Sequence, residues 1–215
     1  SFEPTLDYVV TKVARFPFDK FSDASNKLGT QMKATGEVMS IGRTMEESLL
    51  KAMRSLETGV CHIYHKKFDD WTNDRLLEYI AEPTDDRLYA IAQLIRGGVD
   101  LVLIYNRTKI DMFFLEKFKN IVEFERVVEA APMDIEVLRE AKRMGFSDKF
   151  IGQLWGVSQH DMYLLREKNG IFPVYKMIDT CASEFSSYVP YFYSTYEDEN
   201  ESLVSDKEKI VVLGS

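Results

Sequence analysis

Three side chains with metal-binding or nucleophilic chemistry lie close together in one segment of the chain. They are Cys61, His62 and His65, whose thiolate and imidazole groups are ligands that zinc prefers. A zinc site normally adds a second, distant pair of ligands, and only His160 and Cys181 remain to supply one. We therefore expect no metal site in this chain.

Cys181, in the phrase Asp179-Thr-Cys-Ala182, supports a second hypothesis, a thiol nucleophile that a histidine base activates. A buried structural thiol is the favoured interpretation, because no sequence neighbour would stabilise its thiolate. The paired carboxylates Glu46-Glu47 and Asp85-Asp86 lie at predicted helix starts, where the macrodipole accounts for them. Neither a G-x-x-x-x-G-K-[ST] loop nor a G-x-G-x-x-G fingerprint is present. We expect no catalytic residue and no bound cofactor.

Residues 145–170 resemble a helix-turn-helix, with two short helices on either side of Gly156. Reading DNA requires exposed basic or amide side chains on the second helix. That helix has few side chains that could contact bases, and its polar and aromatic residues are Gln159, His160, Asp161, Tyr163, Arg166 and Lys168. Two short helices that pack on a core are therefore favoured, and a self-contained helical binding module is the alternative.

Composition and charge exclude several classes of protein. With 45% hydrophobic and 29% charged residues, the chain is not disordered, collagen-like or stapled by disulfides. The net charge of −8 repels nucleic acid and anionic membranes, and no apolar run approaches the ~20 residues that span a bilayer. We expect neither partner. Two widely separated cysteines favour a reducing, cytoplasmic location.

The first part of the chain has α/β character. Two strands are predicted at Leu6–Phe16 and Glu37–Gly42, where β-branched and apolar residues concentrate. Thr44-Met-Glu-Glu47 predicts a capping box, in which the threonine hydroxyl and the glutamate carboxylate accept hydrogen bonds from exposed amides. The helix that follows is expected to end at Gly59.

Helical spacing dominates from Trp71 to Gly170. Helix starts are predicted at Pro83–Asp85, Thr108–Asp111, Asp134, Ser147 and Ser158, and stops at Gly97–Gly98, Gly145, Gly156 and Gly170. Extended segments return at Pro173–Tyr175, Tyr191–Tyr193 and Lys209–Ser215. The sequence therefore predicts a mainly α fold, an orthogonal multi-helix domain flanked by short α/β segments.

Several phrases in the chain are shared with one family. They include Ser1-Phe-Glu-Pro4, Asp7–Lys12, Gln31–Lys33, Gly36–Met39, Ile41–Thr44, Gly145–Asp148, Pro173–Lys176, Asp179–Ala182, Tyr193–Glu197 and Val212–Gly214. The chain is similar to the middle of the large chain of carbamoyl-phosphate synthase. The similarity covers essentially the whole chain and is loosest between Val60 and Thr108.

The resemblance implies an order of segments. Residues 1–56 would be the tail of a first ATP-grasp half that makes carboxyphosphate, and 57–208 a helical oligomerisation domain. Residues 209–215 would be the first strand of the carbamoyl-phosphate half. The whole enzyme would be a ligase that makes carbamoyl phosphate from bicarbonate, glutamine or ammonia, and two ATP, for arginine and pyrimidine biosynthesis. Its cofactors would be ATP with Mg or Mn, and K, and its partner a glutaminase small chain. We expect this segment to be structural and inactive alone.

The resemblance also assigns a role to Glu37, because the glutamate of the Gly36-Glu-Val-Met39 phrase would line an internal carbamate passage. An ion pair with Lys33 or Arg43 is the alternative. Apolar residues from Ile110 to Val128 cover more than one stripe of a helix, which leaves a face free for a two-fold contact with a second copy. We expect Phe113 or Phe124 in that interface; a helix enclosed on all sides is the alternative.

Overall fold

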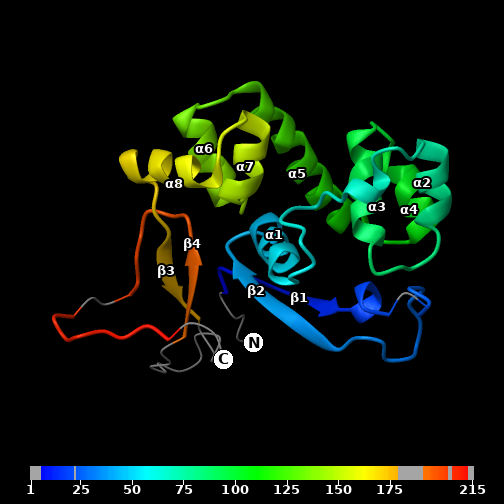
Figure 1. Ribbon diagram of the computed structural model, residues 1–215, viewed down its shortest axis with the longest axis horizontal. Coiled ribbons are helices and arrows are strands. Elements are labelled where there is room, and N and C mark those ends of the chain that lie inside the picture. Colours follow the sequence, from blue (N-terminus) through cyan, green and yellow to red (C-terminus); the bar gives the residue numbers. More distant parts are fainter. Residues whose placement is uncertain (1–5, 22, 179–190, 203–204, 213–215) are drawn as a thin grey trace, which may run out of the picture.

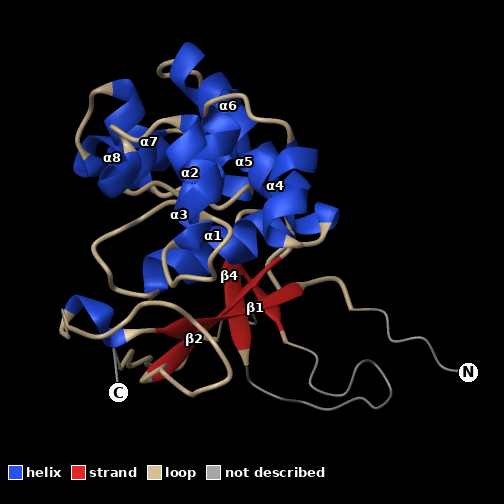
Figure 2. Ribbon diagram, turned by 90° about the vertical axis from the view of Figure 1, so that its right-hand side faces the viewer, coloured by secondary structure: helices blue, strands red, loops and turns tan. Residues whose placement is uncertain are grey.

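The computed structural model describes residues 6–21, 23–178, 191–202 and 205–212. In this part a body of helices lies over two separate two-stranded sheets, as Figures 1 and 2 show from two directions. The mainly α fold is confirmed. The elements are β1 (Val9–Arg15), the 3-10 turn η1 (Pro17–Asp19), β2 (Gly36–Gly42), α1 (Met45–Ser55), the 3-10 turn η2 (Lys66–Phe68), α2 (Asn73–Tyr79), α3 (Arg87–Arg96), α4 (Leu101–Thr108), α5 (Met112–Ala130), α6 (Ile135–Arg143), α7 (Asp148–Trp155), α8 (Gln159–Lys168), β3 (Val174–Met177) and β4 (Phe192–Thr195).

The first sheet is an antiparallel pair that packs on α1. Its register runs from Val9 opposite Gly42 to Arg15 opposite Gly36. Ser48 on α1 donates its hydroxyl to Thr11 Oγ1 of β1, at 2.7 Å, in the buried seam between helix and sheet. Because buried polar groups are costly unless they are hydrogen-bonded, this contact fixes how the helix sits on the strands.

The capping box at α1 forms in a modified way. The Thr44 hydroxyl accepts a hydrogen bond from the backbone N–H of Glu47 at 3.2 Å, as predicted. The Glu47 carboxylate accepts from the N–H of Arg43, at 2.7 Å, one residue earlier than in the usual box. The hydroxyl satisfies an amide that the helix start leaves unpaired, and the carboxylate satisfies the amide of the residue before the cap.

Three predicted helix ends lie elsewhere. The start predicted at Pro83–Asp85 comes later, because α3 begins at Arg87 after the cap residue Asp86. Gly59 does not end α1, because the helix stops at Ser55 and Glu57 takes the left-handed conformation just beyond its cap, with φ 54°. The Thr108–Asp111 start is a junction: Thr108 ends α4, and the Asp111 carboxylate caps α5. The caps at Asp134, Ser147 and Ser158 are confirmed.

Gly145 serves two purposes at the end of α6. Its φ of +90° is a conformation that side chains rarely adopt. A Cβ placed there would also lie 2.8 Å from the Cα of Glu47 on α1. The absence of a side chain therefore lets the turn after α6 touch the first turn of α1.

The buried core joins α1 to the later helices. Leu50 and Met53 of α1 lie in one hydrophobic cluster with Ile91 of α3 and Ile121 of α5. The structure therefore shows continuous packing across the predicted boundary between residues 56 and 57, and the boundary itself stays a prediction.

The two predicted C-terminal features differ in outcome. The hairpin of β3 and β4 is antiparallel, with Val174 opposite Thr195. In contrast, Ile210–Val212 form no strand and are strongly exposed, because within the described ranges no strand lies beside them to complete a ladder. Cys181 lies outside the described residues. No helix in the described part of the chain is long and apolar enough to cross a bilayer.

We predict that Thr44→Ala lowers the free energy of unfolding by about 1 kcal/mol, the usual cost of removing a cap hydroxyl. Thr44→Ser keeps the acceptor oxygen and should stay close to the parent. Urea denaturation measures both. An unchanged midpoint and slope for the alanine variant would contradict the role of Thr44 in starting α1.

Candidate association surface

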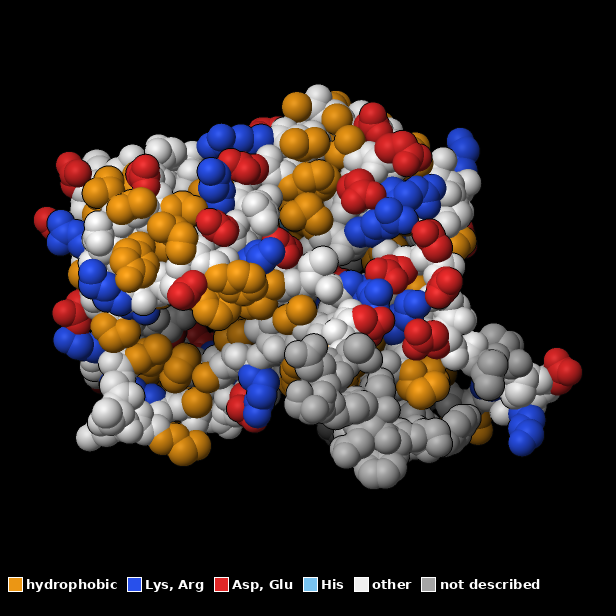
Figure 3. Space-filling model, turned by 180° about the vertical axis from the view of Figure 1, so that it is seen from behind, with side chains coloured by type: hydrophobic (Ala, Val, Ile, Leu, Met, Phe, Trp, Pro, Cys, Tyr) orange, Lys and Arg blue, Asp and Glu red, His pale blue; other side chains and the backbone are white. Residues whose placement is uncertain are grey.

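Large apolar side chains are exposed together on α4 and the first turn of α5. Each is 39–52% exposed, and we call the set the α4–α5 patch: Val102, Leu103, Tyr105, Phe113 and Phe114. Seen from behind, hydrophobic side chains gather over these elements at the left of Figure 3. A gathering of exposed apolar side chains is typical of a site where another surface docks.

Local sequence places this patch. The Asp100 carboxylate caps α4, and the Asp111 carboxylate caps α5 by accepting from the N–H of Phe113 at 2.8 Å. Between them, Lys109 adopts a left-handed conformation that reverses the chain. Ile104 and Leu115 point into the core, so the opposite faces of both helices are left to solvent.

Charges of both signs surround the patch. The ammonium of Lys109 lies 5.3 Å from the ring centre of Tyr105, and that of Lys117 lies 5.2 Å from the ring centre of Phe113. Carboxylates of Asp111 and Glu116 are exposed nearby on the same helix. In a two-fold contact each surface meets a copy of itself, so a patch with both signs at its edge is self-complementary.

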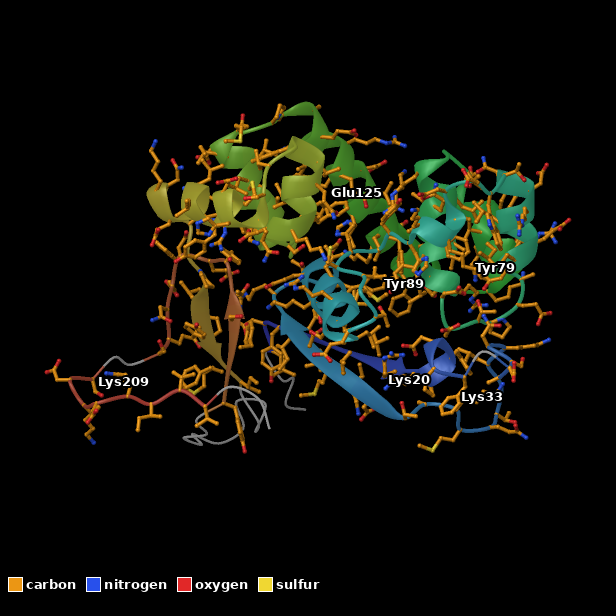
Figure 4. The ribbon with its side chains drawn as sticks, viewed as in Figure 1. Lys20, Lys33, Tyr79, Tyr89, Glu125 and Lys209 are labelled. Atoms are coloured by element: carbon orange, nitrogen blue, oxygen red, sulfur yellow. The ribbon has the colours of Figure 1, made fainter. Side chains whose placement is uncertain are left out.

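A buried ion cluster sets the orientation of α5 relative to α3. Arg96 donates to the Glu125 carboxylate from Nε and from a terminal nitrogen, both at 2.7 Å. His62 Nε2 lies 3.0 Å from the same carboxylate, and Arg96 also donates to the carbonyl of Ile63. Figure 4 shows Glu125 on α5, on the side toward α3. The cluster thus fixes the helix whose first turn forms the patch.

The protonation states in this cluster follow from burial and hydrogen bonding. Burial alone would raise the pKa of Glu125, but the hydrogen bonds from Arg96 and His62 lower it. Burial lowers the pKa of His62 in spite of its carboxylate partner. The imidazole is therefore neutral and donates Nε2–H to Glu125, since an ionised carboxylate only accepts. Its ring stacks on Phe150, with centroids 3.6 Å apart.

The two predicted interface residues differ in their surroundings. Phe113 is 50% exposed in the patch. Phe124 is half-buried, with its ring edge-on to Phe146 at 5.7 Å, so it faces the core. The first turn of α5 is therefore not enclosed, contrary to the alternative of a wholly surrounded helix, and Phe113 is the exposed member of the pair.

Glu37 lies on the face of β2 away from α1. Its carboxylate is largely exposed and pairs with Lys12 of β1 at 2.6 Å. The expected alternative partners are wrong: Lys33 donates to backbone carbonyls of its own loop, and Arg43 pairs with Glu197 at 2.9 Å. A role in a carbamate passage stays a prediction.

The remaining candidates have structural contacts. His62 belongs to the ion cluster, and His65 Nδ1 accepts from the N–H of Lys67 at 3.1 Å. No group of three or more acidic, histidine or cysteine side chains among the described residues is placed to hold a metal ion. In the helix-turn-helix-like segment, Arg166 is buried and binds Asp148 at 2.7 Å, so it does not reach out toward a base edge.

The ion cluster itself was only partly visible in the sequence. Glu125 falls in helical register with Phe118, Ile121 and Val122, which marks it as a carboxylate on a core-facing stripe. Its partners are 29 and 63 positions away, and no spacing in the sequence connects them.

We predict that His62 makes folding acid-sensitive. Between its ordinary pKa of 6.5 and its lower folded value, the unfolded chain binds more protons, so stability falls as the pH drops. The slope for one proton is at most about 1.4 kcal/mol per pH unit. His62→Gln should flatten this slope between pH 6.5 and 5, above the range where Glu125 titrates. The matched control is the same substitution at the exposed His160. Urea unfolding of the parent and both variants at several pH values measures the three slopes. Equal slopes in all three proteins would refute the role of His62.

In a comparison with protein families, residues 37–170 match the family described as the carbamoyl-phosphate synthetase large chain, oligomerisation domain. The matched region runs from β2 to the end of α8. It covers more than half of the chain and includes the ion cluster and the α4–α5 patch. This confirms the family resemblance seen in the sequence. The chain belongs to the oligomerisation-domain family of the carbamoyl-phosphate synthetase large chain.

Proposed function

We propose that the chain self-associates through the α4–α5 patch, as a two-fold contact between copies. The observation that carries this proposal is the exposure of Phe113 and Phe114, side by side, at the start of an otherwise core-bound helix. Aromatic side chains supply much of the binding energy when an interface buries them. The mixed charges at the edge of the patch favour a second copy over a strongly charged partner.

We propose further that the chain serves a complete ligase as its connecting and oligomerisation segment. That enzyme would make carbamoyl phosphate from bicarbonate, glutamine or ammonia, and two ATP, in the cytoplasm, for arginine and pyrimidine biosynthesis. Two ATP-grasp halves with Mg or Mn, and K, and a glutaminase small chain would complete it. Support comes from the family match and from the shared phrases at both ends. The exposed Glu37 is compatible with a surface that meets another part of the enzyme.

The association proposal predicts that Phe113→Asp converts the oligomer to monomer, because each copy would bury a carboxylate at the contact. Phe172→Asp is a matched control, since Phe172 is 51% exposed and precedes β3, at the other end of the molecule from α4 (Figure 1). Sedimentation velocity over a wide concentration range measures both. A parent chain that is monomeric throughout contradicts self-association. Dissociation by Phe172→Asp alone would contradict the assignment of the interface to the α4–α5 patch.

The ligase proposal predicts a division of activity. The complete enzyme should form carbamoyl phosphate from bicarbonate, ATP and ammonia. The 215-residue chain alone should hydrolyse no ATP, since it contains no recognisable phosphate-binding loop. A coupled ATPase assay tests the chain, and turnover that rises with the amount of purified protein would contradict the structural role.

A further inference from the structure

A cavity of about 400 Å³ opens where the start of α3 meets the first strand and the turn after it. Its walls come from the end of β1 and η1, the end of α1, and Pro83–Tyr89. In Figure 4, Tyr89 at the start of α3 lies above the segment with Lys20 and Lys33. A cavity of this volume is within the range that binds small molecules.

Specific contacts border the cavity on one side. The N–H of Leu28 donates to the carbonyl of Pro83 at 2.7 Å, and Lys27 forms a β-bridge with Thr84. Lys27 also pairs with the Glu82 carboxylate. These contacts hold the 23–35 loop against the loop before α3, so one wall of the cavity is anchored at its edge.

Two opposite charges beside this cavity lack ion-pair partners. Arg87 is half-buried, and the one hydrogen bond of its side chain in the described structure goes to the carbonyl of Ile80 at 3.5 Å. Asp85 is also half-buried, and its side-chain partner is the Asn26 amide at 3.4 Å. Across the described ranges, no carboxylate lies within 4.0 Å of Arg87 and no cation within 4.0 Å of Asp85, so they do not pair with each other.

The other charged groups of the cavity are engaged. Arg15 donates to the Asp19 carboxylate at 2.8 Å. Asp86 accepts from Lys67 and from the hydroxyl of Tyr79, both at 2.5 Å. Arg87 and Asp85 are therefore the two charges in the cavity that are left to bind something else.

Part of the lining is apolar. Leu28, Met53, Leu56 and Leu88 contribute hydrocarbon surface to the same cavity, which would exclude water around an aliphatic group. Burial lowers the pKa of Arg87 and raises the pKa of Asp85, as expected of charges without close partners.

We propose that this cavity binds a small zwitterion with an aliphatic body, whose carboxylate meets Arg87 and whose ammonium meets Asp85. A ligand with both charges neutralises both partly dehydrated groups at once. An ion with one charge leaves the other unpaired, at the cost of its desolvation. An α-amino acid with a branched hydrocarbon side chain has this chemistry.

Calorimetric titration of the chain with three similar compounds tests the proposal. L-Leucine has both charges, 4-methylpentanoate lacks the ammonium, and 3-methylbutylamine lacks the carboxylate. We expect L-leucine to bind at least tenfold more tightly than either analogue. Equal affinities for the three, or binding of none, would overturn the proposal.

Charge-removing variants assign the two contacts. Arg87→Met should weaken L-leucine and 4-methylpentanoate at least tenfold and leave the amine unchanged. Asp85→Asn should weaken L-leucine and the amine and leave 4-methylpentanoate unchanged. Arg87→Lys keeps the charge and should retain binding, which separates lost affinity from lost folding. Arg139→Met on α6 is the remote control. Loss of binding in the control, or unchanged L-leucine affinity in both cavity variants, would refute the assignment.

Discussion

The buried carboxylate of Glu125 is the constraint on which the helical body depends. A carboxylate in a core is tolerated only when its oxygens are hydrogen-bonded and its charge is matched, and Arg96 and His62 supply both. Because Arg96 ends α3 and His62 precedes η2, one carboxylate ties two segments to α5. A hydrophobic residue at position 125 would pack against the core without a preferred partner, because apolar contacts have no direction. The hydrogen bonds of the ion cluster, in contrast, are satisfied in one register of α5 against α3.

A second carboxylate, that of Asp148, orients the last three helices in the same way. Asp148, at the start of α7, accepts from Lys142 of α6 at 2.9 Å and from Arg166 of α8 at 2.7 Å. Burial lowers the pKa of Lys142 to about 8, against the opposing effect of Asp148. The lysine remains mostly protonated at neutral pH and also donates to the carbonyl of Phe146. Short helices with small contact areas are thus oriented by shared carboxylates as well as by apolar packing.

Local features were predictable from sequence, and contacts between distant segments were not. Ser147 and Ser158 cap their helices as predicted, because a cap needs only its own next three residues. Glu57 takes the left-handed position expected of Gly59, since the end of α1 is set by packing against the rest of the core. Likewise, Phe113 and Phe124 are equivalent in sequence, and only the position of Phe146 decides which ring is covered.

The cavity and the α4–α5 patch are connected through α3, the contact between Arg96 and Glu125, and α5. Arg87 begins the helix at the cavity and Arg96 ends it at Glu125, about 14 Å away at 1.5 Å per residue. From Glu125, α5 runs back to the patch at its first turn. Coupling between two sites requires an element with two arrangements, each favoured by one ligand. The two hydrogen bonds from Arg96 and the one from His62 hold a single arrangement of this path, so a ligand beside Arg87 would change self-association only if it displaced Arg96 from Glu125.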